Sequence, residues 1–237
     1  MKIDVYCLAH QEAKIMPYFM RHYSQFANVI LMEGHSTDKT VEIAESYGAR
    51  IMKIDSNNQI DDDKWTNLKN NCWKESAADW VIVCDADEFV YHPNLLQILE
   101  TTESTVFMPR LFNMFSREFP TTNGQIYEEI GYGREGGAKM NLFKPSQVSE
   151  INYAIGCHDA KPLDKSGNPI HPNISTPLMT LHMRHLSVEY VIAKNAYLFP
   201  RLSEINKKYS WGYHLAAQAD EITRYFNNEM TALIKVV

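Results

Sequence analysis

Three carboxylates stand at the end of an apolar run in the first half of the chain. Residues 80–84 are consecutive apolar residues, rich in β-branched types, and Asp85, Asp87 and Glu88 follow them directly. In an extended segment Asp85 and Asp87 would lie on one side, about 6–7 Å apart, close enough to share a divalent cation or to divide a metal ion and a ligand hydroxyl between them. Without a cation or a donor-rich ligand, repulsion would make at least one of them take up a proton or turn to water. A solvated turn with acids as caps is the commoner interpretation of an isolated Asp-x-Asp, but the position after a buried strand favours a site.

Two further groups in the second half could take part in chemistry. His158 and Asp159 follow Gly156 and Cys157 in a turn of small residues, where they could lie beside a hydroxyl group or form an ordinary hydrogen-bonded surface turn. Residues 207–213 are basic and aromatic. Their aromatic rings could stack on a ligand, although packing against a C-terminal helix is the commoner use.

The elements that must position these residues alternate along the first half. Apolar runs predict strands at residues 3–8, 29–32, 50–54 and 80–84, and helical periodicity predicts helices at 12–26, 38–47 and 61–73. Strands separated by single helices imply a parallel sheet with right-handed crossovers, that is, an α/β fold. Ligands of such sheets bind at the carboxyl ends of the strands, which is where Asp85 and Asp87 stand.

Composition limits the class of protein. The chain has 237 residues, 45% of them hydrophobic, which is enough to bury one core, so we expect a single domain. A net charge of −6 argues against nucleic acid as a partner, and an acidic protein that handles phosphates would need a metal ion. The four cysteines show no Cys-x-x-Cys spacing and predict free thiols. We expect no transmembrane segment and a cytoplasmic location, because no apolar run approaches the roughly 20 residues of a membrane helix and the N-terminus leads into a strand pattern.

The order of these elements resembles the nucleotide-binding half of a glycosyltransferase of the GT-A fold, close to family 2. The resemblance covers about the first ninety residues. It depends on Asp-x-Asp after the fourth strand and on residues 32–40, which read Met-Glu-Gly-His-Ser-Thr-Asp-Lys-Thr. Members of that family often read Asp-Asp-Gly-Ser-Thr-Asp-x-Thr there, so this chain has Glu33 in place of an aspartate and an added histidine.

The resemblance implies roles for particular residues. In the family, the acid of the second loop binds the base or ribose, the first aspartate of Asp-x-Asp lies by the ribose or sugar, and the last binds the metal ion that bridges the diphosphate. The segment after the first strand commonly lies against the base. The residues so implied in nucleotide-sugar binding are Ala9, His10, Glu12, Glu33, Asp85 and Ala86, and the implied metal ligand is Asp87.

Many GT-A enzymes supply a late histidine as a further metal ligand, with a basic residue nearby for the diphosphate. The strand predicted at residues 178–185 offers His182 for the metal and Arg184, which would share its face, for the phosphate. His185 is the substitute if the register differs.

The second half is less regular, as acceptor-binding halves of this fold tend to be. We expect residues 1–110 to bind the nucleotide sugar, 111–186 the acceptor, and 187–237 to form C-terminal helices. Residues 131–136 match Gly-x-Gly-x-x-Gly, but no clear strand precedes them and no helix follows, so we interpret them as a mobile loop over the acceptor and not as a dinucleotide site.

The sequence therefore predicts a metal-dependent glycosyltransferase that uses Mn²⁺ or Mg²⁺ to move a sugar from a nucleoside diphosphate to a glycan or other hydroxyl acceptor. Family 2 members generally invert, which requires a carboxylate to take the acceptor's proton; Asp159 is the first candidate and Glu135 the second. A sugar-phosphate nucleotidyltransferase is an alternative, but the expected Gly-rich stretch after the first strand is missing. A non-catalytic carbohydrate-binding domain is another, and it would need neither metal nor base.

Overall fold

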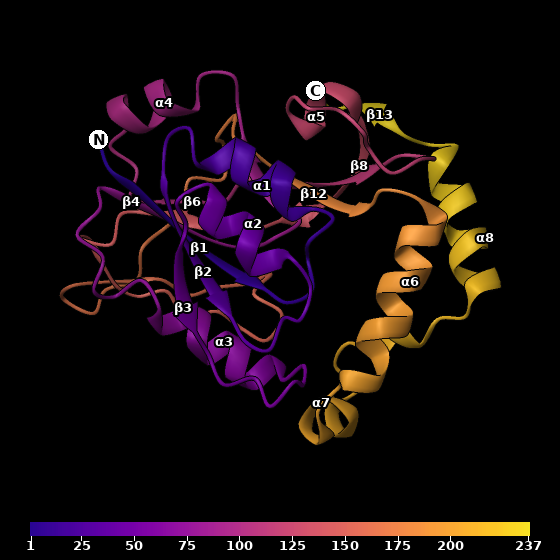
Figure 1. Cartoon of the computed structure of the whole chain (residues 1–237). Coiled ribbons are helices and arrows are strands. Elements are labelled where there is room, and N and C mark those ends of the chain that lie inside the picture. The colour runs from indigo at the N-terminus through magenta and orange to yellow at the C-terminus, as the bar shows by residue number, and fades with distance from the viewer.

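The computed structural model describes all 237 residues and contains two main sheets (Figure 1). The first sheet has the order β3-β2-β1-β4-β9-β6, and its first four strands are parallel. The bounds of these strands are β1 Ile3–Ala9, β2 Asn28–Glu33, β3 Arg50–Lys53, β4 Trp80–Asp85, β6 Val106–Phe107 and β9 Leu142–Phe143. This arrangement confirms the predicted α/β fold with a mostly parallel sheet flanked by helices.

Helices connect the parallel strands and cover the sheet. They are α1 Met16–Tyr23, α2 Thr40–Ser46, α3 Asp62–Asn71 and, after β5, α4 Leu95–Thr101. Alternate residues of β4 enter two separate cores: Ile82 packs with residues of α1, and Val81 and Val83 pack with Trp73 after α3. The strand is thus buried on both faces, as its unbroken apolar run predicts.

The second sheet has the order β13-β8-β7-β12-β5. Its strands are β5 Glu88–Tyr91, β7 Arg110–Phe115, β8 Tyr132–Ala138, β12 Met179–His185 and β13 Ile234–Lys235. The chain passes from the first sheet to the second within the turn between Asp85 and Glu88, because β5 begins where β4 has just ended. Strand β12 then pairs antiparallel with β5 and places His182 opposite Glu88.

Residues 132–136 belong to strand β8, and Gly131 directly precedes it, so the segment is not the loop predicted from the sequence. Their glycines serve close packing of β8 on β7. A Cβ atom on Gly133 would lie 2.7 Å from the carbonyl oxygen of Asn113, and one on Gly136 would collide with the Asn113 side chain. The prediction failed because these glycines resemble a flexible segment in sequence, whereas here they allow two strands to approach.

The C-terminal part is helical and lies along one side of the molecule (Figure 1). It consists of α6 Val188–Leu198, η1 Phe199–Arg201, α7 Glu204–Tyr209, η2 Tyr213–Ala216 and α8 Ala219–Met230. Ser187 caps α6 by accepting a hydrogen bond from the backbone N–H of Tyr190. Asn206 of α7 exchanges hydrogen bonds with Asp62 at the start of α3, which ties the helical part to the first sheet's layer.

Short elements complete the chain: α5 Ile126–Glu129, and the two-stranded sheet of β10 Val148–Glu150 and β11 Leu163–Asp164. None of the helices combines the length and apolar character that crossing a membrane requires.

Candidate active site at the end of the central strand

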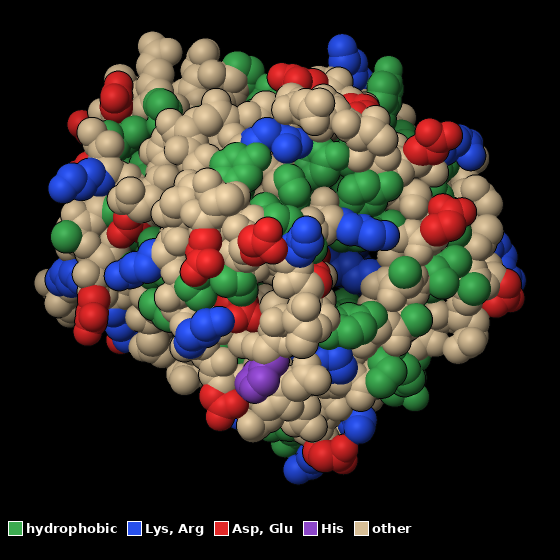
Figure 2. Space-filling model, viewed as in Figure 1, with side chains coloured by type: hydrophobic (Ala, Val, Ile, Leu, Met, Phe, Trp, Pro, Cys, Tyr) green, Lys and Arg blue, Asp and Glu red, His purple; other side chains and the backbone are tan.

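A cavity of about 470 Å³ lies at the carboxyl ends of β1 and β4, where the sheet topology predicts a ligand site. We call it the main cavity. Its walls come from the end of β1, the β4–β5 turn, β12, the start of α3, and the segment from α6 to η2. Figure 2 shows a recess on this side of the molecule with Lys or Arg side chains at its rim.

The sequence predicted that Asp85 and Asp87 lie on one side of an extended segment, and this prediction is wrong. Asp85 ends β4, whereas Ala86 and Asp87 form a turn. Each carboxylate consequently meets a different lysine. Lys69 of α3 donates to Asp85 Oδ1 over 2.6 Å, and Lys194 of α6 donates to Asp87 Oδ2 over 3.0 Å. The cation that the carboxylates were expected to need is therefore supplied by the protein itself.

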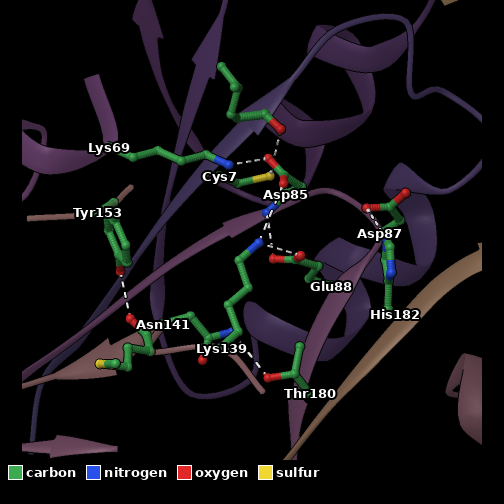
Figure 3. A network of polar contacts seen from close by, with 12 residues as sticks. Cys7, Lys69, Asp85, Asp87, Glu88, Lys139, Asn141, Tyr153, Thr180 and His182 are labelled. Atoms are coloured by element: carbon green, nitrogen blue, oxygen red, sulfur yellow. Dashed lines mark hydrogen bonds and ion pairs between the residues drawn. The ribbon is translucent and has the colours of Figure 1, made fainter. Parts of the chain in front are cut away.

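The ammonium group of a second buried lysine, Lys139, lies between Asp85 and Glu88 (Figure 3). Lys139 Nζ lies 2.5 Å from Glu88 Oε1 and 3.7 Å from Asp85 Oδ2, and the side chains of Lys139 and Glu88 are each 3% exposed. Glu88 also accepts from the backbone N–H of Asp85 over 3.2 Å. Burial alone would raise the pKa of Asp85, but Lys69 and Lys139 outweigh it and lower that pKa, so Asp85 is held ionised.

Asp87 belongs to a separate ion-pair group. Lys194 Nζ bridges it to Glu12 Oε1, at 3.0 and 2.9 Å. Burial works against the charge on Asp87, but Lys194 and then the other positive groups nearby hold its pKa well below the ordinary value. Burial raises the pKa of Glu12, although Lys194 opposes that change.

His182 faces the other oxygen of Asp87. Its Nε2 lies 3.7 Å from Asp87 Oδ1, and its Nδ1 is 2.9 Å from Asn113 Oδ1. With the amide oriented this way, Nδ1–H donates to Asn113 and the lone pair of Nε2 points toward Asp87. Burial lowers the pKa of His182 even though Asp87 opposes it, so the imidazole is neutral near pH 7. Arg184, two residues along β12, also lines the main cavity, and its guanidinium donates to Asn195 of α6.

The segment after β1 also reaches the main cavity. Ala9 and His10 line it. The two ring nitrogens of His10 lie 2.8 Å from the carbonyl oxygen of Gly34 and 2.6 Å from the hydroxyl of Tyr197. Glu33 does not line it: this side chain is buried, accepts from the backbone N–H of Ser36 and pairs with Lys53. Its contacts are those of a residue that fixes the loop.

Neither carboxylate predicted as the base lines the main cavity. Asp159 is exposed and its Oδ1 accepts from the backbone N–H of Ala160, and Glu135 is half exposed on β8 beside Arg110. His158 does line it. Gly156 and Cys157 both have positive φ, 81° and 57°, and of the two exposed residues that follow, His158 and Asp159, only His158 is on the wall of the main cavity.

Residues 12–164 match the model of the family described as Glycosyl transferase family 2. The chain belongs to this family. The resemblance drawn from residues 32–40 and from Asp-x-Asp is thereby confirmed.

The chain is also similar to solved structures. It is 13% identical to S. aureus TarS, with a TM-score of 0.48 over 98% of this chain and 44% of that one. For residues 1–349 of TarS the identity is 13% and the TM-score 0.42, over 62% of this chain and 48% of that one. Glucosyl-3-phosphoglycerate synthase from Mycobacterium tuberculosis, solved with Mn²⁺, uridine diphosphate and glucosyl-3-phosphoglycerate, is 20% identical, with a TM-score of 0.35 over 47% and 44%. The family 2 chain thus spans less than half the length of these proteins.

Sequence reasoning missed the lysines of the candidate site. Lys69 had a readable signal: it shares one face of α3 with Thr66 and comes four residues before Trp73, and all three are buried. A lysine in the apolar stripe of a helix indicates a buried carboxylate partner. Lys194 had a comparable signal, because Tyr190 and Val191, four and three residues before it on α6, are buried. Lys139 had no such local signal.

Proposed function

We propose that the chain transfers a sugar from a nucleoside diphosphate to an acceptor hydroxyl with the help of a divalent metal ion, and that the reaction inverts the anomeric carbon. Family membership supports the reaction class. The observation that carries the metal is the facing pair of Asp87 Oδ1 and His182 Nε2 at the carboxyl end of the central strand.

The donor set fits a divalent ion such as Mn²⁺ or Mg²⁺. A carboxylate oxygen and a neutral imidazole nitrogen face each other, and Asn113 fixes the His182 ring through its other nitrogen, as groups behind metal-binding histidines do. No group of three or more His, Cys, Asp or Glu side chains surrounds a common point, so a bound ion would need ligands from the substrate. An ion held by Asp87 and His182 would supply a Lewis acid for the departing diphosphate.

The protein's own residues supply the remaining functions. Arg184 and Lys194 place positive charge in the wall of the main cavity, where they favour the negative charge that develops on the leaving diphosphate. Lys69 and Lys139 hold Asp85 in one orientation. An ionised carboxylate that is fixed in this way can accept a hydrogen bond from a sugar or ribose hydroxyl. Trp65 and Trp211 give the main cavity apolar walls.

For the proton acceptor we propose His158 in place of Asp159. His158 lines the main cavity and Asp159 does not. Burial lowers the pKa of His158, and Lys139 lowers it further, so its imidazole is neutral at pH 7 and has a lone pair for an incoming proton.

The test is slow donor hydrolysis. Incubated with Mn²⁺ and a panel of nucleoside diphosphate sugars, the protein should release nucleoside diphosphate from one of them, because water can replace the acceptor, and EDTA should stop the release. Asp87→Asn should abolish it. Nucleoside diphosphate release that persists in EDTA would contradict the proposed dependence on a divalent metal ion. No release from any donor, together with glycan binding in the absence of metal, would overturn the enzymatic function.

A further inference from the structure

Lys194 occupies an unusual place in the candidate site. Its ammonium group lies between two carboxylates from different parts of the chain, 2.9 Å from Glu12 Oε1 and 3.0 Å from Asp87 Oδ2. The side chain is 12% exposed. It lines the main cavity and also a smaller one, of about 230 Å³, on the side of His10 and Tyr190. Lys194 is thus a cation built into the wall of the site.

This placement determines which oxygens a metal ion can reach. Asp87 uses Oδ2 for Lys194 and offers Oδ1, and Glu12 uses Oε1 for the same ammonium group. The ligands left facing each other are Asp87 Oδ1 and His182 Nε2. Two protein ligands are few for Mn²⁺ or Mg²⁺, and the positive charge of Lys194, which binds the same carboxylate, repels an incoming ion.

We propose that Lys194 prevents Glu12, Asp87 and His182 from forming a metal site by themselves, so that the protein takes up a divalent ion together with a nucleoside diphosphate and not before it. This inference rests on the proposed function. In the donor-free protein Lys194 neutralises the two carboxylates. In the donor complex the oxygens of the diphosphate complete the ligand set of the ion, and their negative charge offsets the repulsion between the ion and Lys194.

The experiment measures Mn²⁺ binding without any nucleotide, by the loss of the free-ion paramagnetic resonance signal. Lys194→Met should bind Mn²⁺ about tenfold or more tightly than the wild-type protein, because one positive charge at contact distance from Asp87 is gone and Glu12 becomes available. Lys194→Arg keeps the charge and should leave the affinity weak. The double variant Glu12→Gln/Lys194→Met should lose most of the gain, since a neutral amide replaces the freed carboxylate.

A second measurement uses the wild-type protein and does not depend on how the variants fold. Uridine diphosphate should tighten Mn²⁺ binding by about tenfold or more, because the two ligands bind with positive coupling if the diphosphate completes the ligand set of the ion. Equal Mn²⁺ affinity in Lys194→Met and wild type would overturn the inference, as would the absence of coupling between Mn²⁺ and uridine diphosphate in a protein that hydrolyses a uridine-based donor. If no donor is hydrolysed while Lys194→Met still gains Mn²⁺ affinity, the proposed function fails and the role of Lys194 toward metal stands.

Discussion

Replacing Lys139 with methionine should lower the free energy of unfolding by about 3–5 kcal/mol, the cost of removing one partner from a buried ion pair. Lys139 and Glu88 are each 3% exposed, and no other lysine or arginine pairs with Glu88. Methionine has a similar length, so the change removes the charge with little loss of volume. Burial would lower the pKa of Lys139, but Glu88 and Asp85 raise it above its ordinary value, so we expect the lysine to be charged in the folded protein.

The assay is urea unfolding followed by circular dichroism, supported by thermal unfolding. For a chain of this length the predicted loss corresponds to a melting temperature lower by roughly 10 °C. Lys207→Met is the matched control: Lys207 also pairs with a glutamate, but that pair is exposed and should contribute less than about 1 kcal/mol. Lys139→Met/Glu88→Leu should recover much of the loss, because no carboxylate remains buried without a partner at that position. A Lys139→Met protein within about 1 kcal/mol of wild type would refute the reasoning, and so would a double variant no more stable than the single one.

Two further predictions concern histidines. Burial lowers the pKa of His22 to about 4, while Val90 O accepts from its ring. The ring is therefore neutral in the folded protein, and its contribution to stability is complete above pH 6.5. As the pH drops from 6.5 toward 4, the unfolded chain takes up a proton before the folded protein does. The contribution of His22 to stability therefore falls, by about 3 kcal/mol in all. His22→Gln should flatten this part of the pH profile in urea unfolding, exposed His171→Gln should not, and equal profiles would contradict the prediction. His158→Ala should slow donor hydrolysis about 100-fold and Asp159→Asn less than about threefold, as measured by nucleoside diphosphate release; the reverse order would return the base to Asp159.

The sheet of the first half could be predicted because its signals are local. The unbroken apolar run of residues 80–84 requires cover on both faces, and β4 has it. Helix boundaries moved by a few residues: the helix expected from residue 12 begins at Met16, which places Pro17 in its first turn, where a proline is tolerated. The position of Asp85 and Asp87 at the end of β4 followed from the same pattern.

The charge balance of the site could not be predicted from the acids alone. Carboxylate repulsion at Asp85 and Asp87 was expected to require an external cation or a protonation. Instead Lys69 of α3 and Lys194 of α6 each neutralise one of the two aspartates. Lys194 shares a face of α6 with the buried Tyr190 and Val191, which turns it inward, but nothing in the sequence says which carboxylate it will meet.

His182 shows how a single non-local pairing builds the site. Asp87 lies in the turn that leads into β5, so a strand pairing antiparallel with β5 must end its ladder beside that turn. Strand β12 does so, and the backbone N–H of Met183 donates to the carbonyl oxygen of Asp87 over 2.7 Å. Strand β7 on the other side brings Asn113 to the His182 ring. The position of β12 between β5 and β7 thus orients the imidazole from one side and places its free nitrogen against Asp87 on the other. A shift of β12 by one residue would turn His182 to the opposite face of the sheet, so the proposed pairing of His182 with Asp87 depends on the register of β12 in the second sheet.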